Sequence, residues 1–95
     1  MPIAKRDLRK ILNNLGFTEI RGKHHVFFEL HVANRIIRTK ISHGSGKDIG
    51  DALLSHILRK QIYLTKDEFE LARRGQLSKD EYLKILKQKR IIDDI

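Results

Sequence analysis

Residues 21–29 read RGKHHVFFE and contain a turn signal followed directly by a strand signal. Gly22 and Lys23 predict a tight turn, and the aromatic and β-branched residues after them predict a strand over residues 24–31. The two histidines that open this strand belong to a residue type that titrates near neutral pH, so they can take or give a proton under physiological conditions. Because they follow basic residues, the stretch is a candidate site for chemistry on a phosphate ester.

The composition indicates one small basic domain. The chain has 95 residues, and its 20 lysines and arginines exceed its 12 aspartates and glutamates, for a formal net charge of +8. This length allows a single hydrophobic core, and the charge makes nucleic acid the first partner to expect. The sequence has no cysteine, no apolar leader and no apolar run near the length of a membrane span. We therefore expect a cytoplasmic protein that does not associate with membranes.

Strands and a helix are predicted around the central stretch. Residues 17–21 and 35–42 have strand composition, and with residues 24–31 they predict a three-stranded antiparallel meander. Before the sheet, apolar residues at helical spacing predict a helix that Gly16 ends. Strand alternation directs Val26, Phe28 and Leu30 toward the helices, and it places Ile37, Thr39 and Ile41 opposite Ile36, Arg38 and Lys40. The apolar stripe of the first helix is Ile3, Leu8, Ile11, Leu12 and Leu15.

A glycine-rich loop, HGSGK, occupies residues 43–47. Its amides either bind a phosphate at the start of the next helix, with Lys47 adding charge, or its glycines only turn the chain. Asp48 is the predicted N-cap of that helix, which runs to about residue 60 or 61. These elements give an α+β fold of order α-β-β-β-α, with both helices on one face of the sheet and the other face open. The apolar stripe of the second helix is Ile49, Leu53, Ile57 and Leu58, with Leu54 adjoining it.

A short repeat marks the last third of the chain. The segment LTKDEF at residues 64–69 returns as LSKDEY at residues 77–82. Each copy has a Thr or Ser N-cap with Glu at N3, a capping box, and Leu at N′ with an aromatic at N4, a hydrophobic staple. The repeat predicts helices over residues 66–74 and 79–89, separated near Gly75. We expect a core domain over residues 1–62 and a C-terminal helical hairpin over residues 63–95 packed on it.

Four motifs occur in a recognisable order: residues 8–17, residues 21–27, Ile-Ser-His-Gly at residues 41–44, and Ser-His-Ile-Leu-Arg at residues 55–59. Together they resemble the HicA toxins of bacterial and archaeal toxin–antitoxin pairs, over about residues 4–62. The resemblance implies a fold like that of double-stranded-RNA-binding domains. It also implies a ribonuclease that cleaves messenger RNA and is held inactive by a HicB-like antitoxin.

The resemblance centres on Gly22 and His24, and it implies that His24 is the catalytic residue. Lys23 stands where the family usually has serine, and Ser42 stands where a proline is usual. A histidine can act as general acid or base on RNA, whose own 2′-hydroxyl is the nucleophile, so this chemistry needs neither a metal nor another cofactor. The residues that we predict to contact RNA are Arg21, Gly22, Lys23, His25, Arg38, Lys40, His43 and Lys47.

Other interpretations of the same residues remain open at this stage. His24 shares the parity of Val26, so it is either a hydrogen-bonded structural histidine facing the helices or a residue at the rim of a cleft. Arg35, Arg38 and Lys40 either hold RNA or protect an edge strand from aggregation. A non-catalytic RNA-binding module is the main alternative to a nuclease, and a protein-interaction domain that docks through its hairpin is a third hypothesis.

Overall fold

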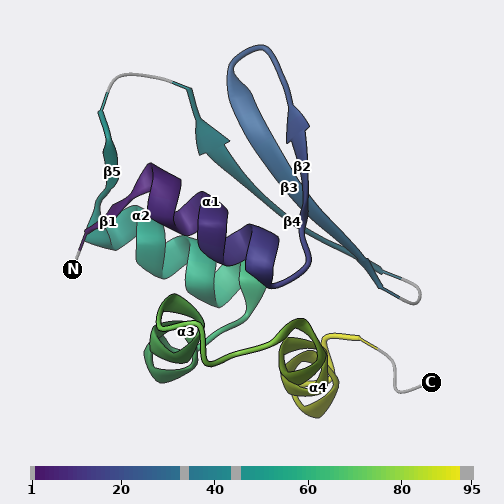
Figure 1. Ribbon diagram of the computed structural model, residues 1–95. Helices are drawn as coiled ribbons and strands as arrows, with labels where there is room; N and C mark the ends of the chain where they lie inside the picture. Colours follow the sequence, from purple (N-terminus) through teal and green to yellow (C-terminus); the bar gives the residue numbers. More distant parts are fainter. Residues whose placement is uncertain (1, 33–34, 44–45, 93–95) are drawn as a thin grey trace.

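The computed structural model describes residues 2–32, 35–43 and 46–92. The chain has an α+β fold, in which a three-stranded sheet is flanked by helices and followed by two further helices (Figure 1). The strands are β1 (Ile3–Ala4), β2 (Thr18–Arg21), β3 (His25–Val32), β4 (Arg35–Ser42) and β5 (Asp48–Ile49). The helices are α1 (Lys5–Asn14), α2 (Asp51–His56), the π-helical η1 (Ile57–Ile62), α3 (Lys66–Arg73) and α4 (Lys79–Gln88).

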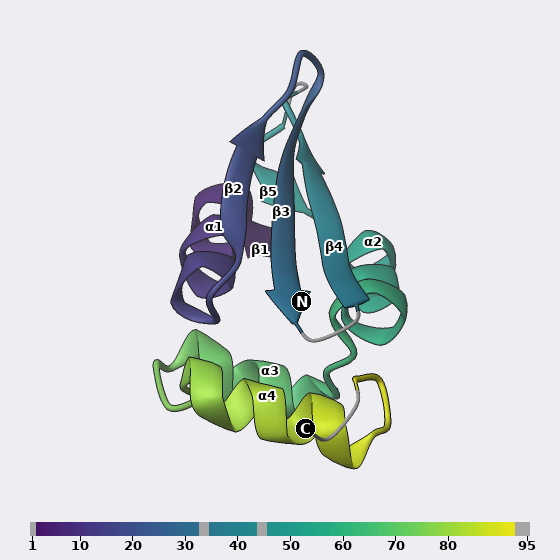
Figure 2. The same ribbon diagram turned by 90° about the vertical axis from the view of Figure 1, so that its right-hand side faces the viewer.

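The predicted meander is confirmed. Strands β2, β3 and β4 pair antiparallel in that order, and β3 pairs with β4 from His25–Ser42 to Val32–Arg35. Helices α1 and α2 lie behind the sheet in Figure 2, so its other face is open toward the viewer. The alternation is as predicted, because the buried residues on the helix side are Val26, Phe28, Leu30, Ile37, Thr39 and Ile41.

The start of α1 and the start of α2 differ from the prediction. Ile3 does not belong to the helix: it pairs with Ile49, and β1 and β5 form a separate two-stranded ribbon. Asp48 is therefore a strand residue and not an N-cap, and α2 begins after Gly50, which makes no side-chain cap. The physical reason is that the ribbon buries both isoleucines at once, at 4% and 3% exposure, between segments far apart in the sequence.

The second half of the predicted helix is a π-helix. Segment η1 brings Ile57 and Ile62 onto one face, since residues five apart align in a π-helix, and both are buried. The segment ends at Tyr63, whose φ of 60° is left-handed, and the N–H of Leu64 donates to the Leu58 carbonyl at 2.9 Å. The predicted stripe is wrong at Leu53, which is 56% exposed, while its neighbour Leu54 is buried.

Both predicted capping boxes are confirmed. The N–H of Glu68 donates to Thr65 Oγ1 at 3.1 Å and the N–H of Thr65 donates to Glu68 Oε1 at 2.8 Å. The second copy, Ser78 with Glu81, has the corresponding distances of 3.1 and 3.0 Å. These bonds satisfy amides that a helix start leaves without partners, so each helix begins where the repeat predicts.

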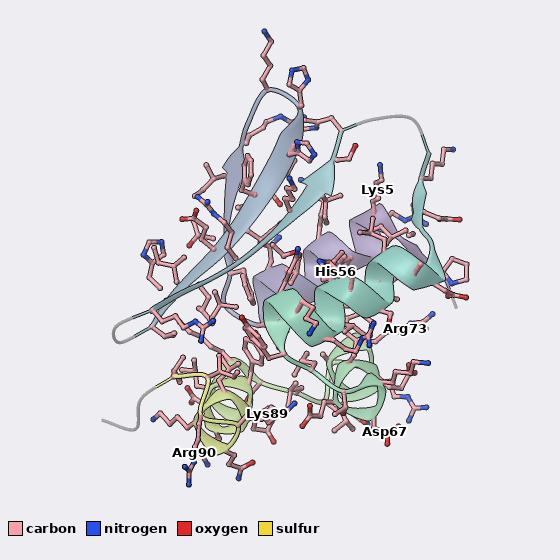
Figure 3. All side chains as sticks on the ribbon, turned by 180° about the vertical axis from the view of Figure 1, so that it is seen from behind. Lys5, His56, Asp67, Arg73, Lys89 and Arg90 are labelled. Atoms are coloured by element: carbon pink, nitrogen blue, oxygen red, sulfur yellow. The ribbon has the colours of Figure 1, made fainter. Side chains whose placement is uncertain are left out.

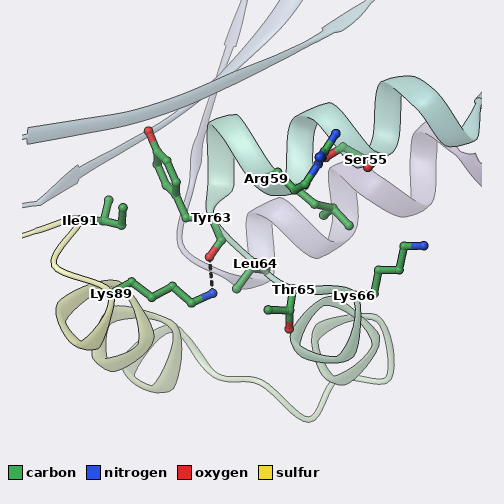
Figure 4. A pocket seen from close by; sticks show the side chains of 9 residues that line it. Ser55, Arg59, Tyr63, Leu64, Thr65, Lys66, Lys89 and Ile91 are labelled. Atoms are coloured by element: carbon green, nitrogen blue, oxygen red, sulfur yellow. Dashed lines mark hydrogen bonds between the residues drawn. The ribbon is translucent and has the colours of Figure 1, made fainter.

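The two C-terminal helices lie across one end of the sheet and of α1 and α2 (Figure 2). Tyr82 is completely buried, its ring centroid lies 5.9 Å from that of Phe17, and its hydroxyl donates to the Ile62 carbonyl at 2.9 Å. Burial raises the pKa of Tyr82 well above its usual value. Near the end of α4, Lys89 Nζ donates to the Tyr63 carbonyl at 2.8 Å (Figure 4). Apolar side chains of α3 and α4 thus belong to one cluster with those of α1 and the sheet.

Gly16 lies under the hairpin as well as ending α1. Its φ of +100° is left-handed, as the predicted C-terminal cap requires. A Cβ on Gly16 would lie 2.6 Å from Cδ of Lys79, the first residue of α4. Across the described ranges, no helix is long and apolar enough to cross a membrane.

We expect Tyr82→Phe to lower the free energy of unfolding by about 1–3 kcal/mol, because it leaves the buried Ile62 carbonyl without its donor. Urea denaturation followed by circular dichroism measures the change. Tyr63→Phe is the matched control, since it removes a hydroxyl whose partner, Arg35, stays exposed to water. Equal losses for the two variants would contradict the structural role given to the Tyr82 hydroxyl.

Candidate functional site: a fixed histidine turn beside a basic cleft

The turn between β2 and β3 has no room for a side chain at Gly22. The N–H of Gly22 donates to the His25 carbonyl at 2.8 Å, which closes the turn. A Cβ built on Gly22 would lie 2.9 Å from that carbonyl oxygen and 2.9 Å from Cε2 of Phe27. Glycine is therefore required here by close approach, and the turn that carries Lys23 and His24 packs directly against an aromatic ring.

The end of β4 holds the same turn from across the sheet. The N–H of His43 donates to the His24 carbonyl at 3.0 Å, which extends the β3–β4 pairing one residue beyond His25 and Ser42. The Nε2 atom of His43 lies 3.1 Å from the Gly22 carbonyl oxygen. A carbonyl can only accept, so Nε2 carries the hydrogen, and Nδ1 of the neutral ring is left as an acceptor.

His24 itself is exposed and precedes the strand, which begins at His25 and not at residue 24 as predicted. It stands opposite His43 and has the strand parity of Val26. It is therefore not the buried structural histidine that strand parity allowed. Lys23 and Arg21 are exposed beside it.

A cleft of about 520 Å³ lies between the start of α1 and the ends of β3 and β4. The buried residues Val26 and Ile41 form part of its lining, and His43 and Lys47 line it as well. His24 is not a lining residue, although it lies on the same turn that His43 contacts. The basic residues that the cleft draws from the first helix are Lys5, Arg6 and Arg9.

The basic side chains of the cleft differ in how far they are engaged. Lys5, which extends from the start of α1 in Figure 3, donates from Nζ to the Ser42 carbonyl at 3.1 Å. Arg9 makes two hydrogen bonds to Glu19, at 3.2 and 2.8 Å, and these lower the pKa of that carboxyl. Arg6 and Lys47 have exposed side chains at the rim.

The remaining predicted RNA contacts lie on the open face of the sheet, away from the cleft. Arg38 donates to Glu29 at 2.7 Å and lies over the Phe27 ring, 5.5 Å from its centroid. Its hydrogen bond, with a second from His31, lowers the pKa of the Glu29 carboxyl. His25 packs on the same ring with centroids 6.0 Å apart, and Lys40 is exposed. The structure thus divides the predicted residues between two faces.

Three other sequence candidates lie apart from the site. Arg35 donates to Tyr63 Oη at 2.8 Å and to the Ile91 carbonyl at 3.0 Å, so it attaches the end of the chain to β4. His56 is exposed on α2 (Figure 3). Gly44 and Ser45, whose amides were candidates for phosphate binding, lie outside the described residues. Within the described ranges, no group of three or more His, Asp or Glu side chains is placed to hold a metal ion.

Comparison with known proteins assigns the chain to a family. The family model for the HicA toxin of bacterial toxin–antitoxin pairs matches residues 6–62, which is more than half of the chain. The chain belongs to the HicA toxin family. Membership gives it the role of a toxin and implies an antitoxin as its partner. No curated protein and no solved structure matched the chain.

The HicA match spans the turn, the sheet and α2 with η1, and it stops where the hairpin begins. The cleft residues of α1 were missed by sequence reasoning, which treated Lys5, Arg6 and Arg9 only as the polar side of an amphipathic helix. The available signal was the clustering of cations in its first turns, where Asp7 is the only acidic residue. The pairing that brings Lys5 to Ser42 gave no sequence signal.

We expect Gly22→Ala to lower the free energy of unfolding by about 1–3 kcal/mol, because the new methyl group is too close to the His25 carbonyl and the Phe27 ring. The control is Lys23→Ala in the same turn, whose exposed side chain makes a change within about 0.5 kcal/mol the expectation. Urea denaturation measures both. If Gly22→Ala were as stable as Lys23→Ala, the close packing of the turn would be refuted.

Proposed function

We propose that this HicA toxin is a metal-independent endoribonuclease of a type II toxin–antitoxin pair, and that it cleaves messenger RNA with His24 as general acid or base. The observation that carries the proposal is the placement of His24, an exposed imidazole on a turn held at fixed geometry by Gly22 and His43 beside a basic cleft. In this proposal the catalytic unit is residues 1–62, with residues 63–95 as an appendage.

The reaction requires two proton transfers and no external nucleophile. A base removes the proton of the 2′-hydroxyl, the 2′-oxygen forms a bond to phosphorus, and the bond from phosphorus to the 5′-oxygen breaks. A proton then goes to that leaving oxygen, which yields a 2′,3′-cyclic phosphate and a 5′-hydroxyl. A positioned imidazole contributes about 10² to 10⁴-fold to such a step. His24 can act in either transfer, because its ring is exposed to substrate.

Negative charge develops on the phosphate oxygens as the new bond forms, and nearby cations stabilise it. Lys23 and Arg21 are exposed next to His24 in the same turn and strand, and Lys47 lines the adjoining cleft. Lys23 replaces a residue that is usually serine in the family, so in this chain an ammonium group supplies charge where a hydroxyl is usual.

A non-catalytic RNA-binding module is the second candidate. It is favoured by the cations Arg38 and Lys40 on the open face, which stand apart from His24 and beside an aromatic ring. Binding by this face requires many weak ionic contacts and little from any single histidine, so its affinity falls steeply with salt.

A HicB-like antitoxin is the expected protein partner, acting in the cytoplasm where messenger RNA is present. To keep RNA out, it must cover a surface rich in positive charge around His24 and His43, and acidic side chains suit that task. The lining of the cleft includes four cationic side chains and one carboxylate, Asp48, which supports this expectation.

Incubation of the purified protein with a long single-stranded RNA in EDTA tests the proposed chemistry. We expect cleavage by the parent and a loss of about 10²-fold or more in rate for His24→Ala, with RNA affinity within about threefold by gel shift. His56→Ala is the control, because His56 is exposed on α2 away from the turn. If neither parent nor variant cuts RNA while both bind it, the binding-module candidate is correct.

His43 is proposed to position His24 through the Gly22 carbonyl. His43→Ala removes that hydrogen bond, and we expect kcat to fall at least tenfold with KM little changed. His43→Gln is expected to recover most of kcat, since its side-chain N–H₂ group can donate to the same carbonyl. If the Gln variant is as slow as the Ala variant and one limb of the pH–rate profile disappears, His43 transfers a proton itself and the positioning role is wrong.

A further inference from the structure

We propose that the basic cleft binds one unpaired nucleotide of the RNA strand next to the scissile bond, with Arg6 and Lys47 on its phosphate. This inference deepens the proposed function and rests on it, because it places a substrate subsite beside the His24 turn. The established family role gives a toxin, without saying where on this chain an RNA strand lies.

The size and lining of the cleft suit a nucleotide. Its volume of about 520 Å³ falls within the range of pockets that hold small ligands, about 300–1,000 Å³. Val26 and Ile41 give it an apolar side against which a base or ribose can pack, and the charged residues stand around them. A base that enters such a cleft cannot be paired at the same time, because its partner strand would have to enter with it. The cleft therefore selects single-stranded RNA.

Two banks form the cleft, and a backbone hydrogen bond fixes their spacing. The N–H of Lys5, at the start of α1, donates to the Lys47 carbonyl at 2.8 Å. Arg6 projects from one bank and Lys47 from the other, and both side chains are exposed. By contrast, Arg9 is already engaged by Glu19. Arg6 and Lys47 are thus the cations best placed to close on a phosphate from two sides.

The cleft is continuous with the proposed catalytic turn. Val26 follows His24 by two residues on the same face of the sheet, and Ile41 precedes His43 by two on the neighbouring strand. Two strand residues span about 6.6 Å, so a nucleotide over Val26 lies directly beside the turn. His43 touches both regions, since it lines the cleft and contacts the Gly22 carbonyl.

Binding of a short single-stranded RNA to His24→Ala protein tests this subsite without cleavage. In that background we compare Arg6→Ala with Lys47→Ala as a double variant against Lys10→Ala with Lys84→Ala, which removes the same charge from exposed sites elsewhere. We expect the cleft pair to weaken binding about tenfold or more and the control pair less than about threefold. The salt dependence, as the slope of log K against log salt, should fall by about 1.4 for the cleft pair, because each lost contact to a single strand removes about 0.7.

The same four proteins are then titrated with a duplex of the same sequence. We expect the duplex to bind more weakly than the single strand and the two double variants to bind it equally. If the cleft pair weakens duplex and single strand alike, or if both pairs weaken the single strand alike, the nucleotide subsite is wrong. The outcome is separate from catalysis: a parent that fails to cut RNA refutes the nuclease but leaves a selective loss of binding as proof of the subsite.

Discussion

The pairing of β3 with β4 is the constraint on which the candidate site depends. The two strands pair along their whole length, and the ladder continues for one hydrogen bond beyond it, from the His43 amide to the His24 carbonyl. Because strand register is fixed by which residues are buried, the burial of Val26 and Ile41 also determines that the two histidines stand opposite each other. Core packing and site geometry are therefore set by the same contacts.

The excess of positive charge is distributed unevenly over the molecule. On the open face, Arg38 is neutralised by Glu29, and at the edge of the cleft Arg9 is neutralised by Glu19. Partly exposed pairs of this kind contribute little to stability, but they remove a cation from competition for an anionic ligand. The exposed charge of Arg6 and Lys47 then has the larger influence on where a phosphate settles, on the helix side of the sheet and next to the turn.

The features that the sequence predicted well are those with a short period or a local hydrogen bond. Alternation in β3 and the capping boxes at Thr65 and Ser78 depend on residues a few positions apart, and they occur as predicted. The ribbon that joins Ile3 to Ile49 depends on residues far apart in the chain, so apolar periodicity assigned both to helices. The cleft could not be predicted for the same reason, because β1, α1 and the end of β4 meet only in the folded chain.

The end of the second helix explains why the hairpin packs where it does. A π-helical segment followed by a left-handed residue leaves its final carbonyl groups without the next turn to satisfy them. Three donors satisfy them here. The Leu64 amide bonds Leu58, the Tyr82 hydroxyl bonds Ile62, and Lys89 Nζ bonds the Tyr63 carbonyl (Figure 4).

Two of those donors come from α4 and the residue that follows it, outside the stretch that matches the HicA family. Removing them would leave polar groups unpaired at the base of the sheet, one of them the carbonyl of the completely buried Ile62. The same helix end supplies Leu58 and Ile62 to the core that supports β4, whose far end carries His43. The hairpin thus stabilises the catalytic unit from the end opposite the His24 turn, and it leaves both the turn and the basic cleft uncovered.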